Sequence, residues 1–335
     1  MIKNFSIILA AFVLLTGLSG CNSGIASDSG LNIVTTVFPI YDWVNNILGD
    51  NRVGAEVSLL LDSGVDLHSF QPSAEDIMKI SSCDLFIYVG GVSDSWVSDA
   101  LKEPTNKNIR VLNLIDTLGD TAKEEELIEG MQEHNHEHEH EYEHEHEHEH
   151  DGNQNVIEYD EHVWLSLKNA ALFVDAISSS LEEIDAENAG IYRNNAESYT
   201  EKLISLDDKY HNVISRSSTK TLIFADRFPF RYLVDDYGLD YYAAFTGCSA
   251  ETEATFETII FLSDMVDELS LGAVIKIDGS DDKLALTVIE NTKSKNQKIL
   301  TLDSIQSITA KDIKNGAAYL SIMEDNLKVL TEALN

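Results

Sequence analysis

The sequence predicts an α/β protein made of two parallel-sheet lobes that are joined by one long rigid α-helix. In residues 31–120 and again in residues 220–333, short β-branched apolar runs alternate with segments of helical apolar spacing. This alternation is typical of parallel sheets covered by helices. Between the two regions, residues 167–213 lack proline and follow helical spacing, which predicts the connecting helix. A length of 335 residues also fits about two domains.

The first predicted lobe comprises residues 31–166. It opens with the β-branched run LNIVTTVF, a buried strand that Pro39 ends, and a helix follows at 40–49. Ser73 is expected to cap a short helix, because two acidic residues follow it in the first turn. The remaining strands of this lobe are predicted at 55–61, 84–89 and 109–114.

The second predicted lobe comprises residues 214–335 and repeats the alternation. The helix of residues 167–213 separates it from the first lobe. At about 1.5 Å per residue, this helix is long enough to span both lobes. The elements expected in the second lobe are strands 220–225 and 241–245, helix 256–270, strand 273–277, helix 283–292, strand 298–302 and helix 309–333.

The N-terminus reads as an export signal. In residues 1–20, Lys3 supplies a positive charge and residues 7–18 form an apolar run too short to span a bilayer. The letters LSGC that follow fit the bacterial lipobox, in which Cys21 is lipidated. Residues 21–30 are small and polar, as a flexible tether should be. We therefore expect a lipid anchor at the extracytoplasmic face of the cell membrane; an ordinary signal peptide is the alternative.

Composition and motifs argue against two classes of function. The net charge of −35 makes nucleic acid an unsuitable partner, because its phosphate backbone would be repelled. A surface hydrolase would need a nucleophile elbow or a zinc-binding HExxH helix. The chain contains no Gly-x-Ser-x-Gly, and no HExxH outside one histidine-rich tract. We expect a binding protein and not an enzyme.

That tract holds eight of the eleven histidines, between Glu133 and Asp151, where most of them alternate with glutamate. Histidine-rich tracts are typical of metal binding, and neighbouring carboxylates favour a bound cation. An alternating, flexible segment cannot hold one preorganised geometry, so we expect an auxiliary metal-gathering loop at about residues 120–155; a solvated acidic loop is the alternative. The histidines are His134, His136, His138, His140, His144, His146, His148 and His150.

Two solitary histidines are better candidates for a tight site. His68 lies in DLHSFQPS, directly after a predicted strand, and His162 lies in DEHVWLSLKN, just before the connecting helix. α/β proteins place ligands at such strand and loop ends. His211, near the end of the predicted helix, is expected to be structural or exposed.

These histidine segments closely resemble those of the cluster A-I solute-binding proteins, the metal-binding lipoproteins of zinc and manganese ABC importers. That family carries D-P-H-x-[FY]-x-P-[ST] and D-P-H-[VI]-W-L-x-x-x-N; this chain replaces the proline before each histidine. The lipobox, the opening VTTVFPIYDWV, the histidine-rich loop, the long helix and the closing LDSI also match. The resemblance implies two Rossmann-like lobes with a metal cleft between them. It also implies a monomer that passes its metal to a membrane permease.

The family usually supplies four metal ligands, two from each lobe. The resemblance implies that His68 and His162 are the ligands of the first lobe. In the second lobe Asp303, within LDSI, matches the fourth ligand.

The third ligand is open, because zinc-binding members have histidine there and manganese-binding members have glutamate. In this chain the best-spaced position is Ala225, which cannot bind a metal. We expect Asp226 to replace it, with Glu251, Glu253 or water as alternatives.

Zn(II) is the expected metal, and Mn(II) or iron is the alternative. Two imidazoles and two carboxylates suit zinc, although oxygen ligands also suit manganese. The histidine-rich loop resembles that of zinc-binding members. A surface adhesin or metal buffer, in which the loop itself acts, is a second hypothesis.

Two cysteines remain when Cys21 is lipidated, namely Cys83 and Cys248. An exported protein permits a disulfide between them. Two free thiols fit the sequence equally well.

Overall fold

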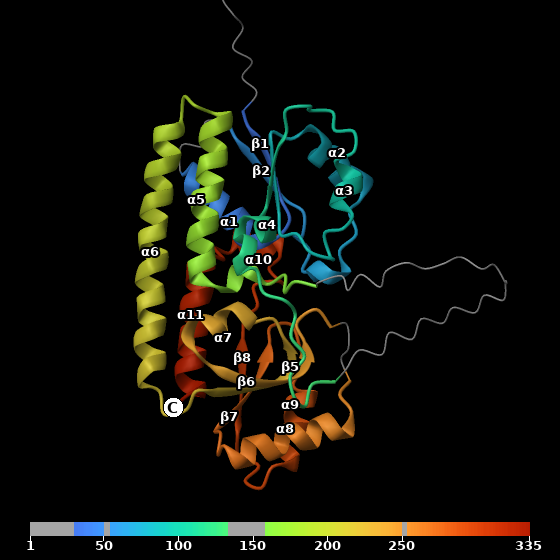
Figure 1. The fold of residues 1–335 in the computed structure, drawn as a ribbon, viewed down its shortest axis with the longest axis vertical. Coiled ribbons are helices and arrows are strands. Elements are labelled where there is room, and N and C mark those ends of the chain that lie inside the picture. Colours follow the sequence, from blue (N-terminus) through green and yellow to red (C-terminus); the bar gives the residue numbers. More distant parts are fainter. Residues whose placement is uncertain (1–29, 50–53, 133–157, 250–252) are drawn as a thin grey trace, which may run out of the picture.

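Two four-stranded parallel sheets organise the computed structural model, which describes residues 30–49, 54–132, 158–249 and 253–335 (Figure 1). In the first lobe the strand order is β2-β1-β3-β4, and every neighbouring pair is parallel. The carboxyl ends of the strands therefore meet at one edge, where α/β proteins bind ligands. The strands are β1 (Asn32–Thr35), β2 (Glu56–Leu59), β3 (Leu85–Tyr88) and β4 (Arg110–Asn113).

Short helices and turns follow the strands of the first lobe. The first helix buries Trp43, whose ring meets that of Tyr319 edge-on at 5.2 Å between centroids. The predicted cap at Ser73 is confirmed, because Ser73 and Asp76 form a reciprocal capping box. The helices are α1 (Phe38–Leu48), α2 (Ala74–Ser82), α3 (Val97–Ala100) and α4 (Leu114–Leu118), with 3₁₀ turns η1 (Leu67–Ser69), η2 (Gly119–Thr121) and η3 (Val163–Leu165).

The second lobe repeats this plan with strand order β6-β5-β7-β8, again parallel. Its pairing between β5 and β6 shifts by one residue between Phe224 and Arg227. Such a bulge redirects the side chains around it. The elements are β5 (Thr221–Phe228), α7 (Arg231–Tyr237), β6 (Asp240–Thr246), α8 (Phe256–Glu268), β7 (Ala273–Ile277), α9 (Lys283–Asn291), β8 (Lys298–Leu302), α10 (Ala310–Lys314) and α11 (Tyr319–Ala333).

The long helix predicted between the lobes is α6 (Ala189–Arg216), which runs beside α5 (Leu167–Ile184) along both lobes (Figure 1). The spacing had predicted one continuous helix over residues 167–213. The structure has two helices there, because the chain reverses between α5 and α6. At the reversal Asp185 accepts a 2.7 Å hydrogen bond from the Asn188 side chain. Such local side-chain bonds compete with helix continuation, and apolar spacing alone does not report them.

One apolar core extends from the first sheet through α1, α5, α6 and α11 to the second sheet. A smaller cluster packs beneath α8 and α9 on the other side of the second sheet. This shared core holds both lobes against the same helices, so the edges of the two sheets face each other in a defined way. Within the described ranges, no helix is long and apolar enough to cross a bilayer. The predicted two-lobed α/β fold is confirmed.

Candidate metal centre

His68 is held in place by the turn that follows β2. Asp66 caps this turn, because its Oδ1 accepts a 3.0 Å hydrogen bond from the backbone N–H of His68. On the far side of the ring, Nδ1 lies 2.8 Å from Ser93 Oγ and 3.3 Å from Glu161 Oε2. The Glu161 carboxylate favours a proton on Nδ1, and the Ser93 hydroxyl can accept its hydrogen bond, which leaves the Nε2 lone pair free.

His162 is positioned in the same way by Asp160. The Asp160 carboxylate accepts hydrogen bonds from the backbone N–H of His162 at 2.8 Å and from its Nδ1 at 2.9 Å. The ring is fully buried, and the indole of Trp164 lies edge-on to it. Burial opposes a charged ring, but the charge and hydrogen bond of Asp160 outweigh it and raise the pKa of His162. A carboxylate at Nδ1 is the usual way to orient a metal-binding Nε2.

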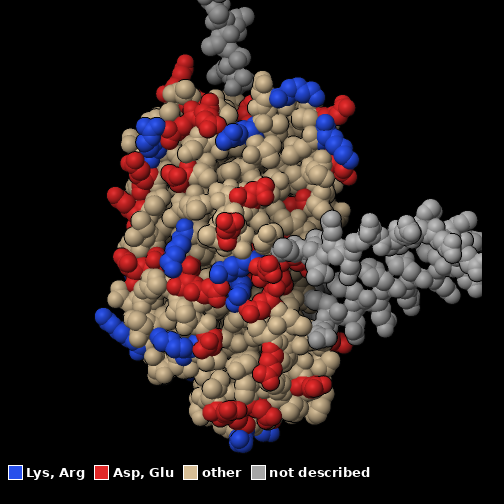
Figure 2. All heavy atoms as spheres, in the orientation of Figure 1, with Lys and Arg blue, Asp and Glu red and all other residues tan. Residues whose placement is uncertain are grey.

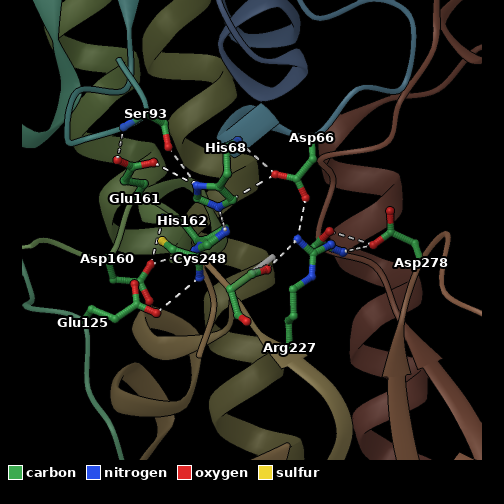
Figure 3. A network of polar contacts seen from close by, with 12 residues as sticks. Asp66, His68, Ser93, Glu125, Asp160, Glu161, His162, Arg227, Cys248 and Asp278 are labelled. Carbon is green, nitrogen blue, oxygen red and sulfur yellow. Dashed lines mark hydrogen bonds and ion pairs between the residues drawn. The ribbon is translucent and has the colours of Figure 1, made fainter. Parts of the chain in front are cut away.

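The two imidazoles meet at their free nitrogens (Figure 3). Nε2 of His68 lies 3.3 Å from Nε2 of His162, and the ring planes are inclined by 63°. With both Nδ1 atoms protonated, the two Nε2 lone pairs face each other with no proton to share. Two nitrogen ligands bound at about 2.0–2.1 Å to one tetrahedral zinc ion lie about 3.3 Å apart. The pair therefore has the separation that a shared zinc ion requires.

Cys248 completes a group of three ligand atoms. Its Sγ and the ligand nitrogens of the two histidines all lie within 4.8 Å of one another. Its backbone N–H donates a 3.2 Å hydrogen bond to Glu125 Oε1. Burial and the nearby carboxylates raise the pKa of the Cys248 thiol. Glu251 and Glu253 were the candidates predicted from this segment, and the thiol was not among them, although its place directly after β6 was an available signal.

Buried carboxylates surround the three ligand atoms. Glu161 accepts a 2.8 Å hydrogen bond from the backbone N–H of Ser93. Burial favours its neutral form, but the contacts with His68 and Ser93 outweigh this and hold the pKa of Glu161 below its ordinary value. Asp94 differs, because burial raises its pKa to about 7. Negative charge next to the histidines favours a bound cation.

Asp226, the predicted third ligand, lines the cleft between the lobes but is bonded to the backbone. Its Oδ1 accepts a 2.8 Å hydrogen bond from the N–H of Arg227, and its Oδ2 accepts one of 3.1 Å from Ile277. Asp226 lies in the bulge of β5, where Ala225 is buried. The structure does not bring the Asp226 carboxylate into the group of three.

Asp303, the predicted fourth ligand, directly follows β8. Its Oδ1 accepts a 2.7 Å hydrogen bond from the N–H of Ile305, whose φ of +62° is costly for a β-branched residue. The same turn is tied to the first lobe, because the Trp164 indole donates a 2.9 Å hydrogen bond to the carbonyl of Ser304. Burial and the charge of Asp278 raise the pKa of Asp303 to about 6. Asp303 also stands outside the group of three.

A cleft of about 850 Å³ lies between the lobes and is lined by Asp66 and Ser69, which flank His68 in the chain. The first lobe lines it with Gly64, Asp66 and Ser69, and the second lobe lines it mainly with residues of β5 and with residues that follow β7 and β8. Arg227 bridges the lobes, because its Nη1 lies 2.7 Å from Asp66 Oδ2 (Figure 3). Burial opposes the charge of Asp66, but His68 and Arg227 outweigh it and lower the pKa of Asp66.

The remaining candidates lie apart from this group or outside the described residues. Cys21, the eight histidines of the tract and Glu251 lie outside them, whereas Glu253 lines the cleft. Cys83 and Cys248 are both free thiols, which settles the alternative that the sequence left open. His211 lies half-exposed on α6, as expected.

Comparison with known proteins finds similarity to components of zinc-uptake systems. The family model described as zinc-uptake complex component A, periplasmic, matches residues 33–333. The zinc-binding lipoprotein AdcA of Streptococcus pneumoniae (strain ATCC BAA-255 / R6) is 31% identical over 333 residues, which cover 98% of this chain and 61% of AdcA. The high-affinity zinc uptake system protein ZnuA of Bacillus subtilis (strain 168) is 29% identical over 340 residues, which cover 100% of this chain and 99% of ZnuA.

A solved structure shares the fold. The Zn(II)-bound ZnuA-like domain of Streptococcus pneumoniae AdcA matches with a TM-score of 0.68 and 28% identity, over 91% of this chain and 98% of that domain. The chain spans about three fifths of the length of the pneumococcal AdcA proteins that it matches, at 61%.

Proposed function

This chain belongs to the family of periplasmic zinc-uptake components, and we propose that it is the extracytoplasmic Zn(II)-binding component of an ABC importer. It captures the ion between its lobes and delivers it to a membrane permease. The family resemblance that the histidine segments indicated is thus confirmed. The observation that carries the proposal for this chain is the 3.3 Å separation of the two Nε2 atoms.

Zinc fits the residues at this point better than manganese does. Two imidazole nitrogens are borderline-soft ligands, whereas manganese prefers carboxylate, carbonyl and water oxygens. The Irving–Williams order also makes a site of this kind bind zinc more tightly than manganese. The relatives AdcA and ZnuA carry zinc in their names. A manganese-uptake protein is the less favoured alternative.

We assign His68 and His162 as the imidazole ligands and Asp303 as a carboxylate ligand from the second lobe. Asp303 already stands in a turn that Trp164 ties to the histidine segment. Asp226 remains a predicted ligand. To bind the metal, its carboxylate would have to give up the hydrogen bonds that it accepts from two backbone N–H groups.

A lipid anchor at Cys21 would hold the protein at the outer face of the membrane, near its permease. Cys21 lies outside the described residues, so this part rests on the lipobox and on the similarity to a lipoprotein. Figure 2 shows acidic side chains distributed over both lobes of the face in view, interspersed with basic ones. A surface of net negative charge raises the local concentration of cations.

The histidine-rich tract is proposed as an auxiliary loop that concentrates zinc near the cleft. The described segments on both sides of the tract lie at the site. Before it, Glu125 accepts a hydrogen bond from the N–H of Cys248. After it, Asp160 orients His162 and is itself joined to the earlier segment by a 2.8 Å hydrogen bond to the carbonyl of Lys123. These contacts of the flanking residues support a role of the tract at this site.

Zinc titration in competition with a chromophoric chelator tests the proposal. The mature chain and a variant lacking residues 133–151 should both retain one tight site, and the deletion should remove weaker additional sites. The tight site should disappear in His68→Ala. The proposal would be overturned if tight zinc binding disappeared when residues 133–151 were deleted and stayed unchanged in His68→Ala.

A further inference from the structure

We propose that Cys248 is a ligand of the captured zinc ion, so that two imidazole nitrogens and one thiolate sulfur form the core of the site. The inference rests on the proposed function, because it concerns the same ion. It departs from the histidine or carboxylate that the family resemblance implies for the third position.

Convergence of three chain segments is the first argument. His68 comes from the turn after β2, His162 from the start of η3, and Cys248 from the segment after β6. Among the described His, Cys, Asp and Glu residues, these form the group whose ligand atoms lie within 4.8 Å of one another. Figure 3 shows the sulfur beside the paired imidazoles. Cys248 is thus the second lobe's contribution to a site whose histidines belong to the first.

Gly247 is the second argument, because it permits the close approach of this segment. A Cβ atom at position 247 would lie 3.0 Å from His162 Cε1 and 2.9 Å from the carbonyl oxygen of Phe228. The second contact is with backbone, which cannot swing away as a side chain could. Only glycine lets the backbone before Cys248 pack directly on the imidazole. The hydrogen bond from the Cys248 N–H to Glu125 then fixes the residue there.

The contrast with Cys83 is the third argument. Cys83 is 1% exposed in the apolar core, and its thiol donates a hydrogen bond to the carbonyl of Ile80 at 3.2 Å. That is the environment of an inert structural cysteine. Cys248, by comparison, lies beside the two imidazoles and the Glu125 carboxylate. Asp226, the carboxylate predicted for the third position, instead accepts hydrogen bonds from two backbone N–H groups.

The chemistry is a ligand exchange without oxidation or reduction. The S–H bond of Cys248 breaks, its electron pair forms the sulfur–zinc bond, and the proton leaves. Glu125, which accepts a hydrogen bond from the Cys248 backbone N–H, is a base beside this residue that can pass the proton to solvent. A fourth position remains for Asp303 or water. Because thiolate is a soft ligand, it favours Zn(II) over Mn(II) more strongly than a carboxylate would.

Cobalt(II) substitution tests the proposal on the full mature chain. Co(II) is added below one equivalent, so that the tightest site fills first, and the near-ultraviolet sulfur-to-cobalt charge-transfer band is recorded. The matched variants are Cys248→Ser and Cys83→Ser. We expect the band in the wild type and in Cys83→Ser but not in Cys248→Ser. We also expect Cys248→Ser to lower zinc affinity by about tenfold to a hundredfold, because a serine hydroxyl, or a water held by it, replaces the thiolate only in part.

His68→Ala separates failure of this inference from failure of the proposed function. If His68→Ala abolishes tight zinc binding while Cys248→Ser keeps wild-type affinity, or if the wild type lacks the band, Cys248 is not a ligand and the proposed function stands. If neither substitution changes tight binding, both proposals fall. Thermal unfolding of each metal-free variant shows whether lost binding reflects lost folding.

Discussion

His68 and His162 place their Nε2 atoms 3.3 Å apart although 94 residues separate them in the chain. Each ring is fixed from its other nitrogen, His162 by Asp160 at 2.9 Å and His68 by Ser93 at 2.8 Å. The ligand pair is therefore oriented before a metal arrives. The two side chains lose their conformational entropy when the protein folds. Zinc binding therefore does not have to order them, and the affinity for the ion is not reduced by that cost.

Removing either imidazole should lower zinc affinity by at least about a hundredfold, because a tetrahedral site then lacks a ligand that water replaces poorly. His68→Ala is the cleaner variant, since the His68 side chain is 14% exposed and that of His162 is 0% exposed. Chelator competition measures the change. His211→Ala is the matched control and should bind zinc as the wild type does.

Asp160→Asn should weaken zinc binding by about tenfold to a hundredfold without removing a ligand. The amide oxygen can still accept a hydrogen bond from the backbone N–H of His162. Because the amide is uncharged, it orients the imidazole less firmly and raises the basicity of the ring less than the carboxylate does. The control is Asp207→Asn, which alters the carboxylate next to His211 on α6. Equal affinities in Asp160→Asn and the wild type would mean that the carboxylate does not support the ligand.

Zinc affinity should fall as the pH decreases from about 8 to 6, by about tenfold per pH unit for each proton that the metal displaces. The pKa of His162 is raised above its ordinary value of 6.5, so its protonated form competes with zinc at a higher pH than an ordinary imidazole would. In Asp160→Asn the pH profile should shift downward, because the neighbouring charge is absent. Titrations at a series of pH values measure this, and a profile that does not move would contradict it.

The ion pair between Asp66 and Arg227 should slow zinc release by holding the lobes together. Both side chains are 22–23% exposed, and a pair of this kind contributes about 1 kcal/mol or less in water. Arg227→Gln should therefore speed dissociation about fivefold or less, as followed by stopped-flow mixing with excess chelator. Lys298→Gln, at an exposed pair within the second lobe, is the control and should leave the rate unchanged.

Features that depend on nearby residues could be predicted from the sequence, and features that depend on tertiary approach could not. The parallel sheets, the cap at Ser73 and the two histidine segments follow from local patterns. The reversal at Asp185 was missed because the spacing stays helical on both sides of it. The position of Asp226 depends on a one-residue bulge in β5, which no local pattern records. Cys248 reaches the histidines only because the segment after β6 packs directly against His162, far away in the chain.

The negative charge of Asp303 should have two opposite effects. It should strengthen zinc binding, and it should lower the stability of the metal-free protein. Its pKa is raised from 3.8 to about 6 by burial and by the charge of Asp278. The stability that it contributes is therefore fully present below pH ~4 and is lost as the pH rises through about 6. Ionised Asp303 then costs the metal-free protein about 1–3 kcal/mol at pH 8.

Asp303→Asn should consequently raise the melting temperature of the metal-free protein at pH 8 and leave it near that of the wild type at pH 4. The amide oxygen can keep the hydrogen bond from Ile305, so the strained turn is preserved. The same variant should bind zinc at least about tenfold more weakly, because a neutral amide is a poorer ligand than a carboxylate. Asp325→Asn, an exposed and weaker contributor to the same pKa, is the control. A gain in stability without a loss of affinity would exclude Asp303 as a ligand, because the charge would then cost stability without serving the metal.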